Sequence, residues 1–364
     1  MAEPTIDEPR LRAWWHSAIG GAAAPLRITP FRGGFSNLTY RIDDGDARFV
    51  LRTPPPGVGA GPAHDVVREH RILAAVHPVF DRTPRPIAVE TSPEILGVPF
   101  FVMEFVEGRI LRGTRDEPPL TPDVLAATSR AAIETLAALH RIDVQGTGLD
   151  ALGKGAGYAQ RQIEGWLARY AKAQTHTHEA LDRVRAWLAV NIPADEPAAL
   201  LHNDFKFDNL VVAPDDPTQV RAVLDWEMAT VGSPSFDLGT TLGYWLEPTD
   251  PAPLRALGIG LTARPGAPTR QELFDQYRAA MRSPEQPGVV PVSPVSPVVP
   301  SPSALLSFVF GCLKVSVIAQ QLYARYAAGL TADQRFASLH HAVAALGELA
   351  ERAIRAERIS GLAA

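Results

Sequence analysis

Residues 200–212 read LLHNDFKFDNLVV, and residues 223–227 read VLDWE. Both segments place polar side chains directly beside apolar, strand-forming residues. The apolar runs at 210–213 and 220–224 favour two strands, and the PDDPTQ sequence between them is typical of a turn-rich loop. A hairpin of this kind brings Asn209 and Asp225 to its open end. The sequence therefore predicts two oxygen ligands that face one point.

An amide oxygen and a carboxylate suit Mg²⁺, which rarely takes an all-protein cage and completes its shell with water and phosphate oxygens. Nucleotide phosphates are the natural companions of such a pair. Asp204 lies on the incoming loop before Asn209 and can approach the same point, where it can accept a proton from a substrate hydroxyl. Lys206 offers a point charge for the moving phosphoryl group. Together these residues predict phosphoryl transfer.

Each of these residues taken alone is also typical of a polar surface turn. The joint spacing His-x-Asp-x-Lys-x-x-Asn, followed by a strand pair and an aspartate, is what favours a catalytic loop. His202 precedes Asp204 by two positions. We interpret it as a packed histidine that orients the loop, in preference to a catalytic one.

This segment resembles the catalytic loop and metal-binding aspartate of the protein-kinase-like fold, and specifically of the aminoglycoside phosphotransferase family. The resemblance implies that Asp204 is the catalytic base and that Asn209 and Asp225 are magnesium ligands. It also implies that Asp237, in the sequence FDLG, braces the catalytic loop. Glu227 ends an Asp-Trp-Glu motif where protein kinases have Asp-Phe-Gly. It either assists metal or substrate binding or is a solvated carboxylate.

A kinase-like small lobe also needs a glycine-containing hairpin over the phosphates, a cation on the next strand and a helix acid that holds the cation. Arg52 is the expected cation and Glu69 the expected acid. Arg52 departs from the usual lysine, although an arginine can bind phosphate bidentately. The expected phosphate turn, which alone is equally typical of an ordinary turn, comprises Gly33, Gly34, Phe35, Ser36 and Asn37.

Residues 101–108, FVMEFVEG, resemble the segment that links the two lobes of this fold. The resemblance implies that main-chain groups around Glu104 and Phe105 read the adenine of ATP. A buried edge strand is the alternative reading, and it is compatible with that role.

The order of elements predicts a two-lobe α+β fold. Short β-branched or aromatic runs at 39–42, 49–52 and 100–105 favour strands, and DDGD at 43–46 is typical of a hairpin turn. An apolar stripe within 62–76 predicts one helix among these strands. We expect a nucleotide-binding lobe with a small antiparallel sheet over residues 1–107.

After Gly108 the pattern becomes helical, with helices expected at 125–140, capped by Thr121, and at 331–356. We expect residues 108–364 to form a catalytic and substrate lobe. A proline-rich insertion at 283–303 resists both helix and central sheet, and favours an extended surface loop over a ligand for a partner's aromatic groove.

Three further stretches, GYAQRQIEGW at 157–166, WL at 187–188 and RTPPPG at 52–57, resemble the branch of these phosphotransferases related to kinase-like domains fused to acyl-CoA dehydrogenases. The resemblance implies ATP and Mg²⁺ as cofactors and a small-molecule hydroxyl as the acceptor. As the acceptor, it favours a hydroxy acid or a hydroxyacyl thioester over an aminoglycoside. A nucleotide-binding pseudoenzyme or regulatory module without turnover is the alternative. A protein acceptor is disfavoured because no activation segment separates Asp225 from Asp237.

Composition excludes several classes of protein. The 364 residues contain 35 Lys and Arg against 40 Asp and Glu, so the net charge of −5 argues against a nucleic-acid partner. The apolar run at 304–319 contains Lys314 and falls short of the roughly 20 residues that a membrane span needs. We expect no membrane partner and a buried helix there. The single cysteine, Cys312, and an acidic segment at 1–12 favour a cytoplasmic protein.

Overall fold

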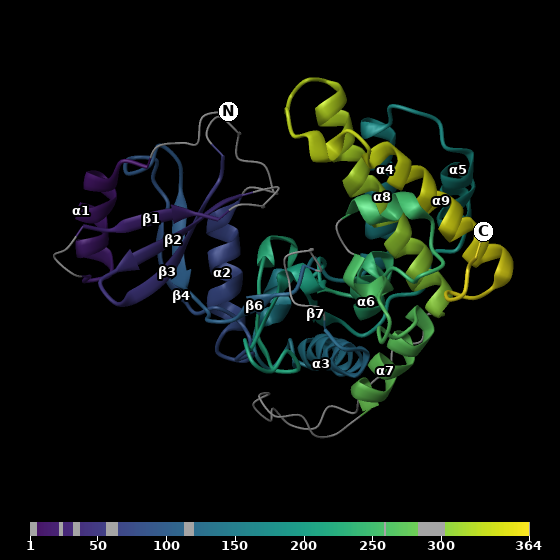
Figure 1. Cartoon of the computed structure of the whole chain (residues 1–364), viewed down its shortest axis with the longest axis horizontal. Helices are drawn as coiled ribbons and strands as arrows, with labels where there is room; N and C mark the ends of the chain where they lie inside the picture. The colour runs from purple at the N-terminus through teal and green to yellow at the C-terminus, as the bar shows by residue number, and fades with distance from the viewer. Residues whose placement is uncertain are drawn as a thin grey trace. The chain divides into compact units, whose positions relative to one another are not determined.

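The chain divides into two compact units in a computed structural model, shown in Figure 1. The first unit comprises Met1–Gly108 and Arg221–Ala229, and the second comprises Arg109–Val220 and Thr230–Ala364. The structure describes residues 6–21, 25–31, 37–55, 65–112, 120–257, 260–282 and 303–363. The expected phosphate turn from Gly33 to Ser36 and almost all of the proline-rich segment 283–303 lie outside these residues.

A five-stranded antiparallel sheet forms the centre of the first unit, in the order β1-β2-β3-β5-β4. The expected hairpin turn is present, with Gly45 at φ +60° between β2 and β3, a backbone conformation that glycine adopts without strain. The strands are β1 (Arg27–Pro30), β2 (Leu38–Asp44), β3 (Ala47–Thr53), β4 (Pro86–Glu90) and β5 (Phe100–Glu104).

The two faces of this sheet carry different helices. Helix α1 (Glu8–Ala18) packs Leu11 and Trp15 against apolar side chains of the strands, among them Leu51. Alternation along β3 turns the next residue, Arg52, to the opposite face, where it meets Glu69 of α2 (Val66–Val76). Figure 1 shows the two helices on opposite sides of the sheet. An apolar face and a charged face therefore come from one strand.

The second unit is mainly helical, as the sequence predicts. Its helices are α3 (Pro122–His140), α4 (Tyr158–Ala173), α5 (Glu179–Val190), α6 (Pro234–Tyr244), α7 (Arg270–Arg282), α8 (Ala304–Ala327) and α9 (Leu339–Ala356). Thr121 caps α3 by accepting a hydrogen bond from the Val124 N–H, as expected. The last helix begins later than predicted, because residues 334–336 form a 3₁₀ turn capped by Asp333.

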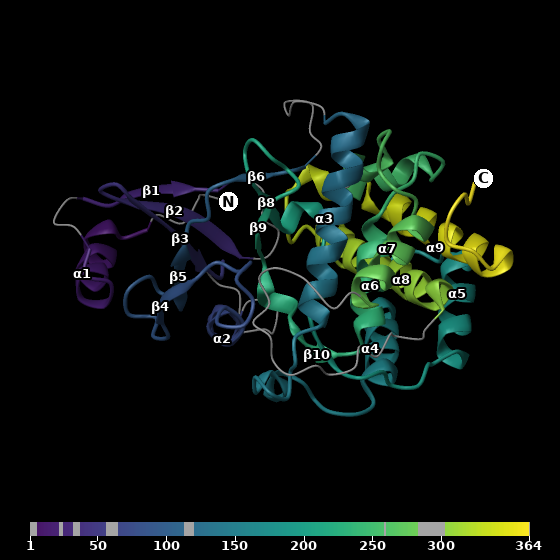
Figure 2. The same cartoon turned by 90° about the horizontal axis from the view of Figure 1, so that it is seen from below.

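Helices α6 and α8 pack with their backbones in direct contact. A Cβ atom on Gly311 would overlap the main-chain carbonyl of Gly239, so this approach requires glycine. Helix α8 is long and apolar enough to cross a membrane, yet 78% of its most apolar window is buried inside the protein. It is the core helix of the second unit, and Figure 2 shows α6 beside it and α9 packed nearby.

Short strands support the polar loops. β7 (Ala199–Leu201) pairs antiparallel with β10 (Thr230–Gly232), and β6 (Arg109–Ile110) pairs with β8 (Leu210–Val212). The predicted second strand of the hairpin is β9 (Val220–Val223). The Ala213 N–H donates to the Gln219 carbonyl at the base of the connecting loop, as a hairpin requires.

Candidate active site

The predicted site residues fall into two groups, one in each unit. The second unit carries His202, Asp204, Lys206, Asn209 and Asp237. The first unit carries Asn37, Arg52, Glu69, Glu104, Phe105, Asp225 and Glu227. Each group is held by its own network of contacts.

The loop that follows β7 is held by a buried carboxylate. Asp237, in the first turn of α6, accepts hydrogen bonds from the N–H groups of His202 at 2.6 Å and Asn203 at 2.8 Å. Burial alone raises the pKa of Asp237, but the hydrogen bond from His140 and nearby positive charge lower it below its usual range. The N-terminal end of a helix also favours this negative charge. Asp237 thus bonds to the main chain directly before Asp204.

Asp204 follows at once, and its carboxylate is oriented by two side chains. Lys206 Nζ lies 2.6 Å from Asp204 Oδ2, and Asn209 Nδ2 lies 2.9 Å from the same atom. Asn209 Nδ2 also donates to the Asp204 carbonyl at 2.8 Å. Because its nitrogen faces Asp204, Asn209 keeps its amide oxygen as the atom able to bind a cation. The structure thus brings together three predicted residues of the loop.

His202 is fully buried beneath this loop. Its Nδ1 accepts a hydrogen bond from the Asp204 N–H at 3.2 Å, and its ring meets Phe205 edge to face. The histidine therefore contacts the main chain of the loop, which is the geometry of an orienting residue.

A pocket opens beside the loop, within the second unit. Its walls are largely apolar, with cationic groups from Lys206 and Arg112. They comprise Leu111, Arg112, Ala132, Ile133, Phe205, Lys206, Phe207, Asp208, Leu210, Thr241, Tyr244, Trp245, Leu261, Thr262 and Leu273.

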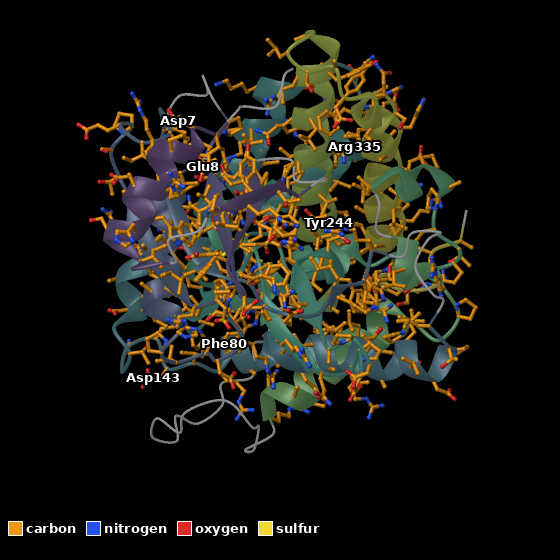
Figure 3. The ribbon with its side chains drawn as sticks, turned by 60° about the vertical axis from the view of Figure 1, so that its left-hand side comes forward. Asp7, Glu8, Phe80, Asp143, Tyr244 and Arg335 are labelled. Carbon is orange, nitrogen blue, oxygen red and sulfur yellow. The ribbon has the colours of Figure 1, made fainter. Side chains whose placement is uncertain are left out.

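Tyr244 is a pocket residue that sequence reasoning missed. Lys206 Nζ lies 4.6 Å from the centre of its ring, and the charges of Asp204 and Lys206 act on its hydroxyl. Burial raises the pKa of Tyr244 above its usual range, so the hydroxyl keeps its proton at neutral pH. Figure 3 shows Tyr244 among the packed side chains, whereas Asp143 lies at their edge. Its position at the end of α6, far along the chain from Asp204, gave no sequence signal.

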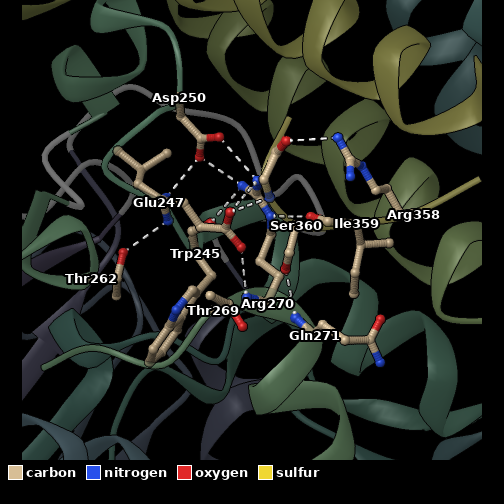
Figure 4. A network of polar contacts seen from close by, with 12 residues as sticks. Trp245, Glu247, Asp250, Thr262, Thr269, Arg270, Gln271, Arg358, Ile359 and Ser360 are labelled. Carbon is tan, nitrogen blue, oxygen red and sulfur yellow. Dashed lines mark hydrogen bonds and ion pairs between the residues drawn. The ribbon is translucent and has the colours of Figure 1, made fainter. Parts of the chain in front are cut away.

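One wall of the pocket is fixed by a buried arginine, shown in Figure 4. Arg270 donates to both carboxylate oxygens of Asp250, at 2.6 and 2.9 Å, and to the carbonyl of Trp245 at 3.1 Å. Its Nε also donates to the carbonyl of Ile359 at 2.6 Å. Because a buried charge needs full pairing, this network holds Trp245 rigidly in the pocket wall.

In the first unit, Arg52 lies among three carboxylates. Its terminal nitrogens lie 3.1 Å from Glu69, 2.9 Å from Asp225 and 3.6 Å from Glu227. Burial alone lowers the pKa of Arg52, but these carboxylates raise it above its usual range. Burial raises the pKa of Glu69 to about 7, although Arg52 opposes the shift. The predicted pair of Arg52 and Glu69 is present.

Arg68 is a second residue that sequence reasoning missed. Its guanidinium donates to the carbonyls of Glu227 at 2.8 Å and Ala229 at 2.6 Å, so it holds the Asp-Trp-Glu turn from the main-chain side. Carboxylate oxygens such as those of Asp225 and Glu227 are the type of ligand that Mg²⁺ prefers.

The Asp-Trp-Glu turn itself has an unusual backbone. Asp225 adopts φ +67°, a left-handed conformation that aspartate tolerates better than most residues. Asn37 Nδ2 donates to Glu227 Oε2 at 3.1 Å, so one residue of the expected phosphate turn contacts the last residue of the metal motif. Residues held in such backbone conformations cluster at functional sites.

The segment expected to bind adenine begins in β5, whose last residue is Glu104, and continues with Phe105. The Glu104 N–H donates to the Arg85 carbonyl at 2.9 Å, and the ring of Phe105 stacks on Phe31 with centroids 6.4 Å apart. The Glu104 N–H is thus already engaged within the sheet.

Two other kinds of potentially reactive side chain, a cysteine and a histidine pair, take no part in the proposed site. Cys312 is buried, and burial raises the pKa of its thiol to about 12, so it is unreactive at neutral pH. His176 stacks on His340, with ring centroids 5.8 Å apart. Within the described ranges, His, Cys, Asp and Glu side chains form no group of three or more arranged to hold a metal ion.

Known proteins share this sequence and fold. The profile of the phosphotransferase enzyme family matches residues 27–273. Acyl-CoA dehydrogenase family member 11 from Rattus norvegicus is 34% identical over 307 residues, which cover 84% of this chain and 37% of that protein. The corresponding human protein is 33% identical over 282 residues, covering 76% of this chain and 36% of its own length. The chain therefore spans about a third of the length of these relatives.

The crystal structure of a provisionally assigned aminoglycoside phosphotransferase from Ralstonia eutropha JMP134 matches with a TM-score of 0.75 and 25% identity. The match covers 97% of this chain and 99% of that one. These findings confirm the kinase-like α+β fold and the resemblance first seen in the catalytic loop. The chain belongs to the phosphotransferase enzyme family.

Proposed function

We propose that the protein transfers the γ-phosphoryl group of ATP to a hydroxyl of a small molecule, in a Mg²⁺-dependent reaction. The carrying observation is the Asp204 carboxylate, which is oriented by Lys206 and Asn209, while Lys206 itself lines a pocket of the second unit. A carboxylate in this setting can accept a proton from a hydroxyl bound in the pocket.

In the proposed reaction the acceptor oxygen forms a bond to the γ-phosphorus while the bond to the ADP oxygen breaks. The hydroxyl proton passes to Asp204, and Lys206 neutralises charge on the moving group. The ring of Tyr244, whose centre lies 4.6 Å from Lys206 Nζ, helps to keep the Lys206 side chain in place. Positioning and electrostatics supply most of the catalysis in such reactions.

Arg52, kept in place by Glu69, would bind the inner phosphates, and Asn209 and Asp225 would be the magnesium ligands, with Glu227 as an assisting carboxylate. Bound Mg²⁺ neutralises phosphate charge in reactions of this class. In support, a solved relative with the same fold, the phosphotransferase APH(4)-Ia, was captured with AMP-PNP and hygromycin B, at a TM-score of 0.54 and 15% identity.

The remaining nucleotide contacts follow from the family resemblance. The phosphate turn would comprise Gly33, Gly34, Phe35, Ser36 and Asn37. Adenine would be read by main-chain groups near Glu104 and Phe105. The engaged N–H of Glu104 favours its carbonyl, or the neighbouring residues, for this role.

We favour a hydroxy acid or a hydroxyacyl thioester as the acceptor. The pocket walls are mostly apolar and suit a hydrocarbon chain, whereas the two cations Lys206 and Arg112, against the one acid Asp208, suit a negatively charged group. An aminoglycoside carries several positive charges and fits such a wall poorly. The names of the curated relatives, which are acyl-CoA dehydrogenases, support the same preference.

The test is ADP release from Mg·ATP across a panel of hydroxy acids, hydroxyacyl thioesters, sugars and aminoglycosides. We expect stimulation by hydroxy acids or their thioesters, and its loss in Asp204→Asn. ATP binding without stimulation by any acceptor would support the alternative, a nucleotide-binding module without turnover. Stimulation by aminoglycosides alone would contradict our choice of acceptor.

A further inference from the structure

Lys314 is a cation in an unexpected place. It lies in the middle of α8, the apolar core helix, and only 1% of its surface is exposed. A lysine is rarely so buried unless it is paired. Among the described residues, no carboxylate forms an ion pair with its ammonium group. Its hydrogen-bond partners are therefore neutral side chains or main-chain groups.

Those partners belong to the loop that carries Asp204. Lys314 Nζ donates to the carbonyl of Asn203 at 2.6 Å and to Thr240 Oγ1 at 3.1 Å, and it lies 3.3 Å from Asn203 Oδ1. Beneath it lies the ring of Trp166, with the centroid 5.5 Å from Nζ, within reach of a cation–π contact. Helix α8 thus contacts the residue that directly precedes Asp204.

The stretch 157–166 supplies the other side of this contact. Trp166 ends that stretch, and Tyr158, at its start, donates from its hydroxyl to Asn203 Oδ1 at 3.5 Å. The motif that marks the branch of the family therefore packs on Asn203 and Lys314. The proposed chemistry uses none of these side chains directly.

Asn203 needs such support because its backbone is left-handed, at φ +67°. Asparagine adopts this conformation at a cost that glycine does not incur. Asp237 holds the N–H of Asn203 and Lys314 holds its carbonyl, so both ends of the residue are bonded to buried charged groups. The direction in which the chain enters Asp204 is thereby fixed.

This arrangement does not serve stability. Burial lowers the pKa of Lys314 to about 8, although Asp237 and Asp204 oppose the shift, so the charged form costs the folded state free energy at neutral pH.

We propose that Lys314, seated on Trp166, is a positioning residue that holds Asn203 and thereby sets the orientation of Asp204 for phosphoryl transfer. Its kinetic consequence rests on the proposed function, whereas its structural consequence does not. The tests separate the two.

The structural test compares hydrogen exchange in Lys314→Met and in a matched control, Ser316→Ala. Ser316 is buried in the same helix and donates only within it, to the Leu313 carbonyl at 2.7 Å. We expect amide exchange in peptides covering 202–206 to accelerate at least tenfold in Lys314→Met and to stay within twofold in Ser316→Ala. Unchanged exchange in Lys314→Met would overturn the proposal, whether or not the protein turns over ATP.

The kinetic test measures ADP release from Mg·ATP with water as the acceptor. We expect kcat of Lys314→Met to fall at least tenfold while KM for ATP stays within twofold, because the nucleotide contacts are untouched. A folded Lys314→Met protein with wild-type kcat would overturn the positioning role. If the wild-type protein shows no turnover with water or with any acceptor of the panel, the proposed function fails and the exchange result still decides the structural claim.

A second-site test distinguishes positioning from general packing. In an Asn203→Gly background the left-handed backbone needs less support, so adding Lys314→Met should cost kcat threefold or less. An equal loss in both backgrounds would contradict the proposal.

If Lys314→Met does not fold, Trp166→Leu keeps the ammonium and removes the ring beneath it. Exchange at 202–206 should then rise about threefold, and no change would again overturn the proposal.

Discussion

The Asp204 loop and the Arg52 cluster achieve order by different means. In the loop, buried charges bond to main-chain groups, as Asp237 does to the N–H groups of His202 and Asn203. In the cluster, Arg52 bonds to the side chains of Glu69 and Asp225. Main-chain bonds fix the path of the chain, whereas side-chain ion pairs can exchange partners when a ligand arrives.

This difference matches the demands of the two groups. A base must keep one orientation throughout a reaction, because a small displacement costs a large factor in rate. A phosphate-binding cation must release one anionic partner when it takes another. We therefore expect substitutions in the loop to change kcat or folding, and substitutions in the cluster to change nucleotide and metal binding.

The sharpest test of the loop is Asp204→Ala. Loss of the proposed base should lower phosphorylation at least about 10³-fold, while ATP affinity stays within a few fold. Turnover with the best acceptor and calorimetric binding of AMP-PNP measure the two quantities. Asp215→Ala, in the exposed hairpin loop, is the control and should behave as wild type. Full turnover in Asp204→Ala would refute the assignment.

The brace is tested by Asp237→Asn. An amide cannot accept both main-chain hydrogen bonds as a charged carboxylate does, so unfolding free energy should fall by about 3 kcal/mol. Asp143→Asn is a matched control, because Asp143 also accepts two main-chain N–H groups, from Gln145 and Gly146, but at an exposed site. Denaturant titration should show a loss below about 1 kcal/mol there. Equal losses would mean that burial of the brace is unimportant.

Lys314 predicts how stability depends on pH. Its pKa is about 8 in the folded protein and 10.5 ordinarily, so between these values the unfolded chain binds more protons and stability rises with pH. The full rise corresponds to about 3 kcal/mol. The charges near Lys314 are Asp237, Asp204, Lys206 and Arg169. From pH 7.5 to 10 the unfolding free energy of wild type should therefore rise relative to that of Lys314→Met, and an unchanged difference would contradict this.

In the cluster, Mg²⁺ should raise the affinity for ATP about tenfold less in Asp225→Asn than in wild type, because a charged ligand becomes a neutral one. Asparagine also tolerates the left-handed backbone at this position. Calorimetric titration with and without Mg²⁺ measures the effect. Glu227→Gln should change it less if Glu227 only assists. A Mg²⁺ response that survives intact in Asp225→Asn would exclude Asp225 as a ligand.

The smallest expected effect belongs to Arg52→Lys. One ammonium cannot reproduce both the 3.1 Å contact to Glu69 and the 2.9 Å contact to Asp225. We expect a loss of about 1 kcal/mol in stability together with weaker ATP binding. Arg48→Lys, on the same strand but with its pair to Glu107 exposed, should show almost none. If Arg52→Lys changed neither the stability nor the ATP binding, the fork geometry of the arginine would be dispensable.

Much of the site could be predicted from the sequence because its motifs are local. Spacing alone places Asp204, Lys206 and Asn209 on one loop, and alternation along a short strand turns Arg52 away from its apolar neighbours. The later start of the last helix was not predictable by periodicity, since residues before Leu339 keep the apolar spacing while Asp333 caps a separate 3₁₀ turn.

The sequence by itself determined the polar loop of Asp204, Lys206 and Asn209, the hairpin after it, the pairing of Arg52 with Glu69 and the family. Only the tertiary structure decided that Tyr244 meets Lys206, that Arg68 holds the Asp-Trp-Glu turn, and that Lys314 meets Asn203 across 111 positions of sequence. The reason is physical. Local patterns encode backbone preference and the direction of side chains, whereas contacts between distant segments depend on how helices pack, here on glycines that let α6 and α8 approach.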